Sequence, residues 1–220
     1  MRVERSRPRP LGPAHESSGA QPGPAPALAV FLHAPRLGAV KPRLAAEVGE
    51  RHALRLYRIM AARTLDAARG AALDVTVWFA PGDAGPEMRH WLGEHCEFRP
   101  QASGDRGARL AAAARAADPR RPWLAIVDDC PGLHSGILRE AADVVRRGEF
   151  AIGPTLDGGF YLVGGTPPIP DIFTAMPWGT GHLLAETRAR LTHVGVVCRE
   201  LTALRAVETV EHARAERLLT

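Results

Sequence analysis

The chain has 220 residues, 45% of them hydrophobic and 24% charged, which is the length and composition of one globular domain with a substantial core. The formal net charge is only +4 and the arginines are interspersed with acidic residues, which argues against nucleic-acid binding. The longest apolar run before residue 50 spans 25–32, far short of the roughly 20 residues that cross a membrane. Since no secretory signal is recognisable either, we expect a cytoplasmic protein that binds no membrane. Three widely spaced cysteines predict reduced thiols rather than disulfides or a zinc site.

Residues 1–26 are rich in Pro, Gly, Arg and Ser and lack hydrophobic periodicity, so we expect a disordered tail before one domain spanning 27–220. Short β-rich segments then alternate with helical ones, a pattern typical of a mostly parallel sheet covered on both faces. We expect strands at 27–32, 74–79, 123–127, 150–152, 160–163 and 194–198. We expect helices at 49–68, 86–93, 105–117, 135–147, 182–192 and 209–219. The predicted fold class is an α/β, Rossmann-like three-layer sandwich.

The loop that follows the first predicted strand has the residue types of a phosphate-binding loop. Gly38 would let the backbone approach an oxyanion, while Lys41 and Arg43 would supply a point charge and a forked donor. Lys41 is the only lysine among 28 basic residues, which favours a functional role. The loop matches neither the Walker pattern nor the dinucleotide fingerprint. An ordinary turn with solvated basic residues is the alternative.

Two carboxylates, Asp128 and Asp129, directly follow the predicted strand at 123–127. Ligands of open α/β sheets bind at the carboxyl ends of strands, and a carboxylate pair there suits Mg²⁺ or Mn²⁺ completed by substrate phosphate oxygens. The alternative is a turn or a helix cap.

An Asp-Gly-Gly sequence, Asp157-Gly158-Gly159, lies between two apolar runs, the second of which contains Tyr161. The turn of a β-hairpin explains this pattern. Equally, the glycines could let a substrate approach the backbone, and Asp157 could join the metal site or activate an acceptor as a base.

Three further positions carry open alternatives. Asp105 starts a predicted helix and is by default its N-cap, whereas Arg109, one turn later, could face a nucleotide or solvent. Trp178 and Thr180 precede the helix predicted at 182–192. They could form a pocket wall, or they could be a buried Trp and a capping Thr.

Taken in order, these segments resemble the small GT-A-type transferases known as selenodomain-associated glycosyltransferases, relatives of the nucleotidyltransferases for molybdopterin and phospholactate. The family patterns K-x-P-x-P-G-x-V-K-T-R-L, G-D-L-G-E-R, G-T-D-S-P-x-L, D-G-G-Y-Y-L-I-G and W-S-T have counterparts here in order and spacing, between residues 28 and about 211. The chain departs from them at His33, Pro42 and Gly179 and with Asp128-Asp129-Cys130 in place of T-D-S.

The resemblance implies a GT-A fold and specific site residues. Nucleotide binding would involve Pro35, Gly38, Lys41, Arg43, Asp105 and Arg109. The acceptor side would involve Gly158, Gly159, Tyr161, Trp178 and Thr180, and the catalytic residues would be Lys41, Asp129 and Asp157. Metal binding would fall to Asp129. Where the family shows D-x-D-T-x-E-D, this chain has Ala206 first, so Glu208 would substitute for the missing Asp, Asp128 would take over its role, or the metal affinity would fall.

Three functions follow as expectations. The first is metal-dependent glycosyl transfer from a nucleoside diphosphate sugar to a small-molecule acceptor, with Lys41 and Mg²⁺ or Mn²⁺ stabilising the departing diphosphate. The second is nucleotidyl transfer from a nucleoside triphosphate with release of pyrophosphate. The third is a nucleotide-binding protein with impaired catalysis, suggested by the missing acidic residue at position 206.

Overall fold

The computed structural model describes residues 24–127 and 129–219. The predicted tail at 1–26 therefore lies outside the described residues except for its last three. The elements follow one another as β1 (Ala27–His33), α1 (Pro42–Val48), α2 (Glu50–Gly70), β2 (Asp74–Ala80), α3 (Gly85–Leu92), β3 (Glu97–Pro100), α4 (Arg106–Arg115), β4 (Trp123–Ile126), α5 (Ser135–Arg146), β5 (Phe150–Pro154), β6 (Phe160–Gly165), α6 (Leu183–His193), β7 (Cys198–Glu200) and α7 (Val210–Ala215).

One seven-stranded sheet forms the centre of the molecule, with the strand order β3-β2-β1-β4-β6-β5-β7. Strand β1 pairs in parallel with β2 on one side and with β4 on the other, and β6 alone runs antiparallel to its two neighbours. This arrangement confirms the predicted single-domain α/β fold with a mostly parallel sheet. Because the chain moves outward from β1 to β3 and then returns to the other side at β4, the sheet has a topological switch point between β1 and β4.

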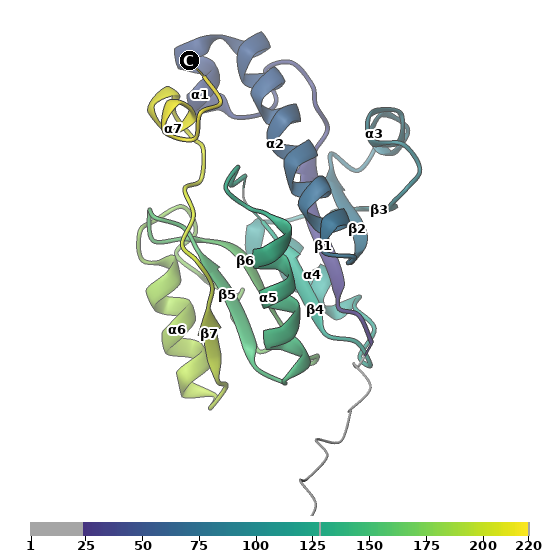
Figure 1. Cartoon of the computed structure of the whole chain (residues 1–220), viewed down its shortest axis with the longest axis vertical. Helices are drawn as coiled ribbons and strands as arrows, with labels where there is room; N and C mark the ends of the chain where they lie inside the picture. Colours follow the sequence, from purple (N-terminus) through teal and green to yellow (C-terminus); the bar gives the residue numbers. More distant parts are fainter. Residues whose placement is uncertain (1–23, 128, 220) are drawn as a thin grey trace, which may run out of the picture.

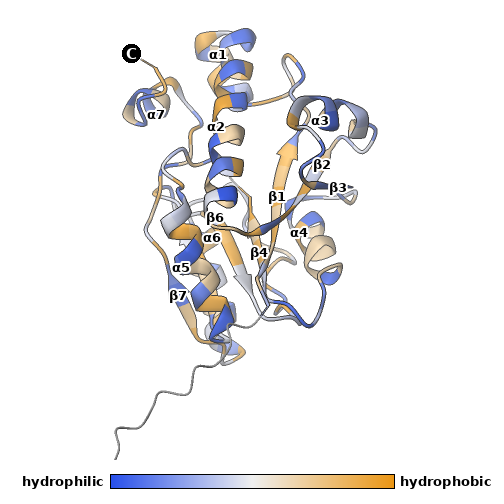
Figure 2. Cartoon of the chain, turned by 45° about the vertical axis from the view of Figure 1, so that its right-hand side comes forward, coloured by the Kyte–Doolittle hydropathy of each residue, from blue (hydrophilic) through white to orange (hydrophobic). Residues whose placement is uncertain are grey.

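Helices cover both faces of the sheet (Figure 1). Alternate β1 side chains, such as Leu28 and Val30, pack with α2 and α5, while Ala29 faces α4 and α6 across the other face. Figure 2 shows the corresponding pattern, in which β1 and β4 are hydrophobic and the helices carry one hydrophobic and one hydrophilic side. The alternation is what a sheet buried on both faces requires. The predicted three-layer sandwich is therefore confirmed.

A smaller third cluster lies beyond the carboxyl ends of the strands. There α1, α7 and the first half of α2 pack around Leu44, Leu56 and Val207. This cluster holds the segment that carries Glu208 against the loop after β1. Within the described part of the chain, no helix has the length and apolar character needed to cross a membrane.

The structure differs from the sequence-based elements in three places. Strand β3 was not expected, because a four-residue edge strand that ends in Pro100 gives almost no alternation to detect. Helix α1 was missed because Pro42 and Gly49 confine it to seven residues. The predicted strand at 194–198 is wrong except at Cys198, because Val194 caps α6 and Gly195, with a φ of 70°, turns the chain before β7 begins.

Candidate functional site

A pocket of about 370 Å³ opens at the carboxyl ends of β1 and β4, at the switch point of the sheet. Ligands of open α/β sheets bind in the crevice at such a switch point. The pocket is lined by Phe31, His33, Ala39, Val40, Lys41, Pro42, Tyr57, Gln101, Arg106, Arg109, Leu110, Val127, Asp129 and Glu208. Its walls thus combine the loop after β1, the segment after β4, the start of α4 and the chain before α7.

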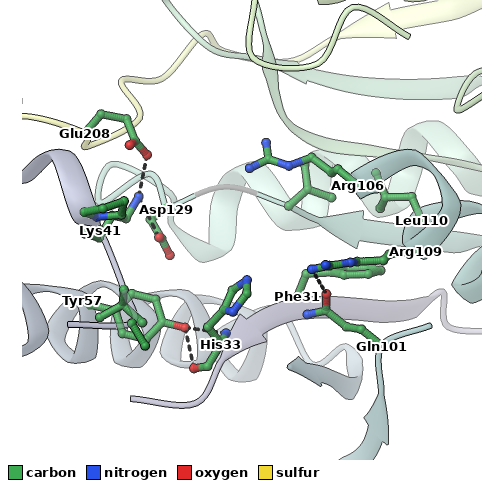
Figure 3. Close-up of a pocket in the computed structure, with 14 residues that line it drawn as sticks. Phe31, His33, Lys41, Tyr57, Gln101, Arg106, Arg109, Leu110, Asp129 and Glu208 are labelled. Atoms are coloured by element: carbon green, nitrogen blue, oxygen red, sulfur yellow. Dashed lines mark hydrogen bonds and ion pairs between the residues drawn. The ribbon is translucent and has the colours of Figure 1, made fainter. Parts of the chain in front are cut away.

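One end of the pocket is built around the ammonium group of Lys41 (Figure 3). Lys41 Nζ lies 2.9 Å from Asp129 Oδ2 and 2.8 Å from Glu208 Oε1. The lysine side chain is 7% exposed, against 18% for Asp129 and 31% for Glu208. A nearly buried ammonium group needs such partners, because the loss of its hydration would otherwise disfavour the charged form in this position. Residues 41, 129 and 208 are thereby joined across three distant parts of the chain.

The backbone of Lys41 adopts a left-handed conformation, with a φ of 48° and a ψ of 57°. Glycine favours this region, and a side chain there costs on the order of 1 kcal/mol. The next residue, Pro42, begins α1 and supplies a φ suited to the first helical turn. Strain of this kind persists only where the surroundings enforce it, and here the two carboxylates and the helix start fix the lysine in the pocket.

The floor of the pocket is fixed by Tyr57, which reaches from α2 to the end of β1. Its hydroxyl accepts a hydrogen bond from His33 N at 2.8 Å and donates one to His33 O at 2.9 Å. Burial, with a smaller contribution from the charge of Asp129, raises the pKa of Tyr57 far above its ordinary value, so the hydroxyl stays neutral. The last peptide of β1 is therefore held in place by a side chain.

The imidazole of His33 faces the pocket between its two ends (Figure 3). Burial lowers the pKa of His33, and the charge of Arg109 lowers it further, while Asp129 acts in the opposite sense. His33 is therefore biased toward its neutral form.

The other end of the pocket is formed by Gln101 and by the first turns of α4. Gln101 Nε2 donates to Leu32 O at 3.2 Å and to Trp78 O at 2.9 Å. Arg109 donates from Nε to Gly104 O at 3.0 Å and from Nη1 to Gln101 Oε1 at 3.4 Å. Arg106 lines the same wall. No single sequence motif marks these residues. Gln101 comes from a loop, and the two arginines occupy helical positions that look like a solvent-exposed face in the sequence.

Four of the predicted site residues meet in this pocket: Lys41, Asp129, Glu208 and Arg109. Asp128 lies outside the described residues. Four others of the predicted nucleotide-binding set do not line it: Pro35 is buried beneath the loop, Arg43 is exposed on α1, and Gly38 and Asp105 lie beside the pocket. The expected N-cap role of Asp105 is confirmed, because Asp105 Oδ1 accepts a 2.8 Å hydrogen bond from Ala108 N.

The predicted acceptor-side residues lie away from the pocket. Tyr161 cannot contact a substrate, because its side chain is fully buried and its hydroxyl donates to Thr202 O at 3.1 Å. Asp157 is exposed in the turn between β5 and β6, which confirms the hairpin interpretation of this segment. Gly158 lies against the backbone of Gly181, so a side chain there would collide with protein rather than meet a ligand.

Three more predicted acceptor-side residues support the fold around the site. Trp178 packs edge-on against Phe160, with ring centroids 5.8 Å apart, and its indole nitrogen lies beside Gly107 at the start of α4. Thr180 Oγ1 donates to Pro177 O at 2.8 Å just before α6. Gly159 forms the end of the hairpin turn, where its N–H donates to Asp157 Oδ1 at 3.3 Å. None of the three lines the pocket.

The candidate metal ligands of the pocket are the carboxylates at the Lys41 end. Across residues 24–127 and 129–219, no group of three or more His, Cys, Asp or Glu side chains is arranged to hold a metal ion. Asp129 and Glu208 are the two carboxylates that the pocket brings to one ammonium group. Hard oxygen ligands in this small number fit Mg²⁺ or Mn²⁺, which take their remaining ligands from water and phosphate.

Solved structures share this fold. A protein from Desulfovibrio desulfuricans G20, assigned as a nucleotide-diphospho-sugar transferase, is 28% identical with a TM-score of 0.78, over 84% of this chain and 82% of its own. A nucleotidyl transferase from Methanothermobacter is 18% identical with a TM-score of 0.57, over 87% and 96%. Rv0371c from Mycobacterium tuberculosis H37Rv, in complex with manganese, is 21% identical with a TM-score of 0.53, over 89% and 100%. No curated protein matches the chain.

A family model adds a sequence-level match. It covers residues 64–180, which is more than half of the chain and includes α4, β4 and the β5–β6 hairpin. The chain therefore belongs to the family described as "Uncharacterized protein conserved in bacteria (DUF2064)".

Proposed function

We propose that the chain is a transferase that binds a nucleoside diphosphate sugar and passes its sugar to a small-molecule acceptor. The observation that carries this proposal is the cluster of Lys41, Asp129 and Glu208 in a pocket at the switch point of the sheet. A cation and two hard carboxylates are what a diphosphate and its counter-ion need. The solved neighbour from Desulfovibrio, assigned as a nucleotide-diphospho-sugar transferase, supports the same class.

The residues of the pocket would have separate roles in such a reaction. Asp129 and Glu208 would hold a divalent cation, which would supply charge neutralisation for the departing diphosphate. Lys41 would direct its ammonium group to a phosphate oxygen, and because it is nearly buried the interaction would be stronger than in water. The fixed peptide of His33 keeps this end of the pocket rigid before any ligand arrives. Mn²⁺ is the first metal to test, since the Rv0371c structure contains it.

The acceptor-side residues predicted from the sequence lie outside the pocket. Asp157 lies in the exposed β5–β6 turn, so the acceptor-side role predicted for it requires an acceptor that extends beyond the pocket. The narrower assignment to selenodomain-associated glycosyltransferases belongs to this proposal as well. It rests on the motif order between residues 28 and about 211.

Nucleotidyl transfer is the second candidate, and the shared fold of the Methanothermobacter nucleotidyl transferase favours it. The same cluster would then hold the phosphates of a nucleoside triphosphate while pyrophosphate departs. A binding protein without catalysis is the third candidate. The position of Glu208 beside Lys41 speaks for an active enzyme, because a carboxylate is present in the site although position 206 is alanine.

A thermal-shift panel tests the site directly. Nucleoside diphosphates, diphosphate sugars and triphosphates are each added with and without Mn²⁺, because a ligand present at 100 times its Kd stabilises the native state by about 2.7 kcal/mol. We expect metal-dependent shifts that Asp129→Asn and Glu208→Gln abolish. Glu211→Gln is the matched control, since Glu211 is exposed in the same segment and does not line the pocket. Shifts retained in both site variants would refute the assigned metal ligands.

The released product separates the candidate reactions. Glycosyl transfer liberates a nucleoside diphosphate, whereas nucleotidyl transfer liberates pyrophosphate, and the two are resolved by ion-exchange chromatography of the reaction mixture. Binding without either product, across a panel of acceptors, would favour the third candidate. No shift with any nucleotide would refute a nucleotide site altogether.

A further inference from the structure

The pocket has two chemically different ends, as Figure 3 shows. Lys41, Asp129 and Glu208 form the Lys41 end, and Gln101, Arg106 and Arg109 lie at the other with Phe31 and Leu110. Under the proposed function, on which this inference rests, the diphosphate occupies the Lys41 end. The nucleoside then extends toward the Arg109 end, and the groups there decide which base is accepted.

The Arg109 end offers a flat apolar surface of the kind that a heteroaromatic ring requires. Phe31 is half-buried on β1 and is backed by Trp78, with ring centroids 6.2 Å apart and planes 12° from parallel. Leu110 and Val127 add aliphatic surface to the same pocket. Apolar walls with a few fixed polar groups are the usual composition of a small-molecule site.

The amide of Gln101 has a defined orientation. Its Nε2 must be the group that faces Leu32 O and Trp78 O, because both are acceptors. Its Oε1 therefore points the other way, where it accepts the bond from Arg109 Nη1. Gln101 thus donates to the backbone and accepts from an arginine. It therefore positions Arg109 and does not compete with it for a ligand.

The polar groups that remain at this end are almost all donors. Each guanidinium carries five N–H donors and no acceptor. The bonds of Arg109 to protein use Nε and Nη1, and Nη2 takes part in neither. Among the ion pairs of the described residues, none involves Arg106 or Arg109. Within residues 24–127 and 129–219, the wall therefore presents two positive groups that form no ion pair with a carboxylate.

We propose that this wall selects a nucleotide whose base carries a carbonyl group, guanine or uracil, over one that carries an amino group at the same ring position, adenine or cytosine. Guanine O6 and N7 accept hydrogen bonds together, an edge that an arginine fork matches, and uracil O4 is a single acceptor for one guanidinium N–H. Adenine N6 and cytosine N4 instead bring donors toward guanidinium groups that can only donate. Arg109 and Arg106 are the specificity-determining residues, and Gln101 is a positioning residue.

The experiment is a set of four Kd values, measured by titration calorimetry with GDP, ADP, UDP and CDP in the presence of Mn²⁺. GDP against ADP compares two purines, and UDP against CDP compares two pyrimidines, so size is matched within each pair. We expect the carbonyl-bearing member of at least one pair to bind about 5- to 150-fold more tightly, the range of one good forked contact. Which pair shows the preference distinguishes guanine from uracil. Equal affinities for all four would overturn the inference and leave the proposed function standing.

A conservative variant separates base selection from general charge. Arg109→Lys keeps the charge but loses the fork, so the ratio between paired nucleotides should fall toward one. Arg115→Lys is the control, because Arg115 ends the same helix outside this pocket. An equal loss of affinity for all four nucleotides and for inorganic pyrophosphate in Arg109→Lys would assign the arginine to phosphate and overturn the inference. If no nucleotide binds the unmodified protein, the proposed function itself fails.

Discussion

The ion pair between Lys41 and Glu208 ties the loop after β1 to the segment before α7, and a double-mutant cycle measures its strength. The variants are Lys41→Met, Glu208→Gln and the combination. Glu208→Gln leaves Lys41 with Asp129 as a partner, whereas Lys41→Met removes the ammonium group from both carboxylates. The lysine variant should therefore lose more stability than the glutamate variant, and the second substitution should cost less once the first is made.

The magnitude follows from distance and exposure. At 2.8 Å and an effective dielectric constant of about 20, the attraction is on the order of 6 kcal/mol before desolvation is subtracted. Breaking a fully buried pair costs about 3–5 kcal/mol, and an exposed pair contributes about 0.2–1 kcal/mol. With Lys41 7% and Glu208 31% exposed, the pair lies between these limits. We expect a coupling free energy of about 1–2 kcal/mol.

Urea unfolding followed by circular dichroism, with EDTA present, gives the four free energies of unfolding. The control is the same cycle at Asp66 and Arg69, a pair 2.9 Å apart whose side chains are 66% and 74% exposed. There the coupling should stay below about 1 kcal/mol. If the Lys41 cycle gives no more coupling than the control, or if Lys41→Met is as stable as the unmodified protein, the account of this cluster is wrong.

Three other predictions concern the surroundings of the cluster. Gly38→Ala should lower the free energy of unfolding by about 1–2 kcal/mol, because φ is 73° and the new carbon would lie 2.9 Å from a carboxylate oxygen of α2. Gly49→Ala is the control for backbone strain alone, because φ is 83° and the new carbon would have no atom within 4 Å. If both variants lose the same free energy of unfolding in urea, the contact with the α2 carboxylate contributes nothing. Tyr57→Phe should cost about 1–3 kcal/mol in the same assay, since it removes both hydrogen bonds to His33, and a negligible change would mean that water replaces the hydroxyl. Because burial and Arg109 depress the pKa of His33 below 6.5, the native state favours the neutral imidazole, and its stability should fall as the pH falls from 6.5 through the folded pKa. Thermal unfolding of His33→Gln across that pH range should lack the part of the pH dependence that comes from His33. Identical plots of melting temperature against pH for the variant and the unmodified protein would contradict this prediction.

The sequence was sufficient to predict the core of the fold. The buried runs at β1, β2 and β4 and the long periodic helix α2 are strong signals, because both faces of the sheet and one face of the helix are apolar. Elements decided by local geometry were not predictable in the same way. Strand β3 exists because β2 offers it a parallel edge, and β7 begins only after the turn at Gly195.

The same distinction between strong sequence signals and local geometry applies to the residues of the candidate site. The meeting of Lys41 and Asp129 could be anticipated, since each follows a strand whose carboxyl end lies at one edge of the sheet. The roles of Gln101, Arg106 and Tyr57 could not, because nothing in their local sequence distinguishes them from solvated or core residues. Tyr161 shows a different limit: the resemblance implied an acceptor-side role for it, whereas its side chain is fully buried in β6, a strand that is buried at all six residues.

The bond from Val207 N to Asp129 O, 3.1 Å long, places the Glu208 segment on a part of the chain synthesised about eighty residues earlier. During translation, a nascent protein could pair β1, β2 and β4 and shape most of the pocket before residue 208 has left the ribosome. Until then Lys41 has one carboxylate fewer, so the Arg109 end of the pocket is formed while the Lys41 end is incomplete. The ion pair between Lys41 and Glu208 should therefore be among the last contacts of the pocket to form.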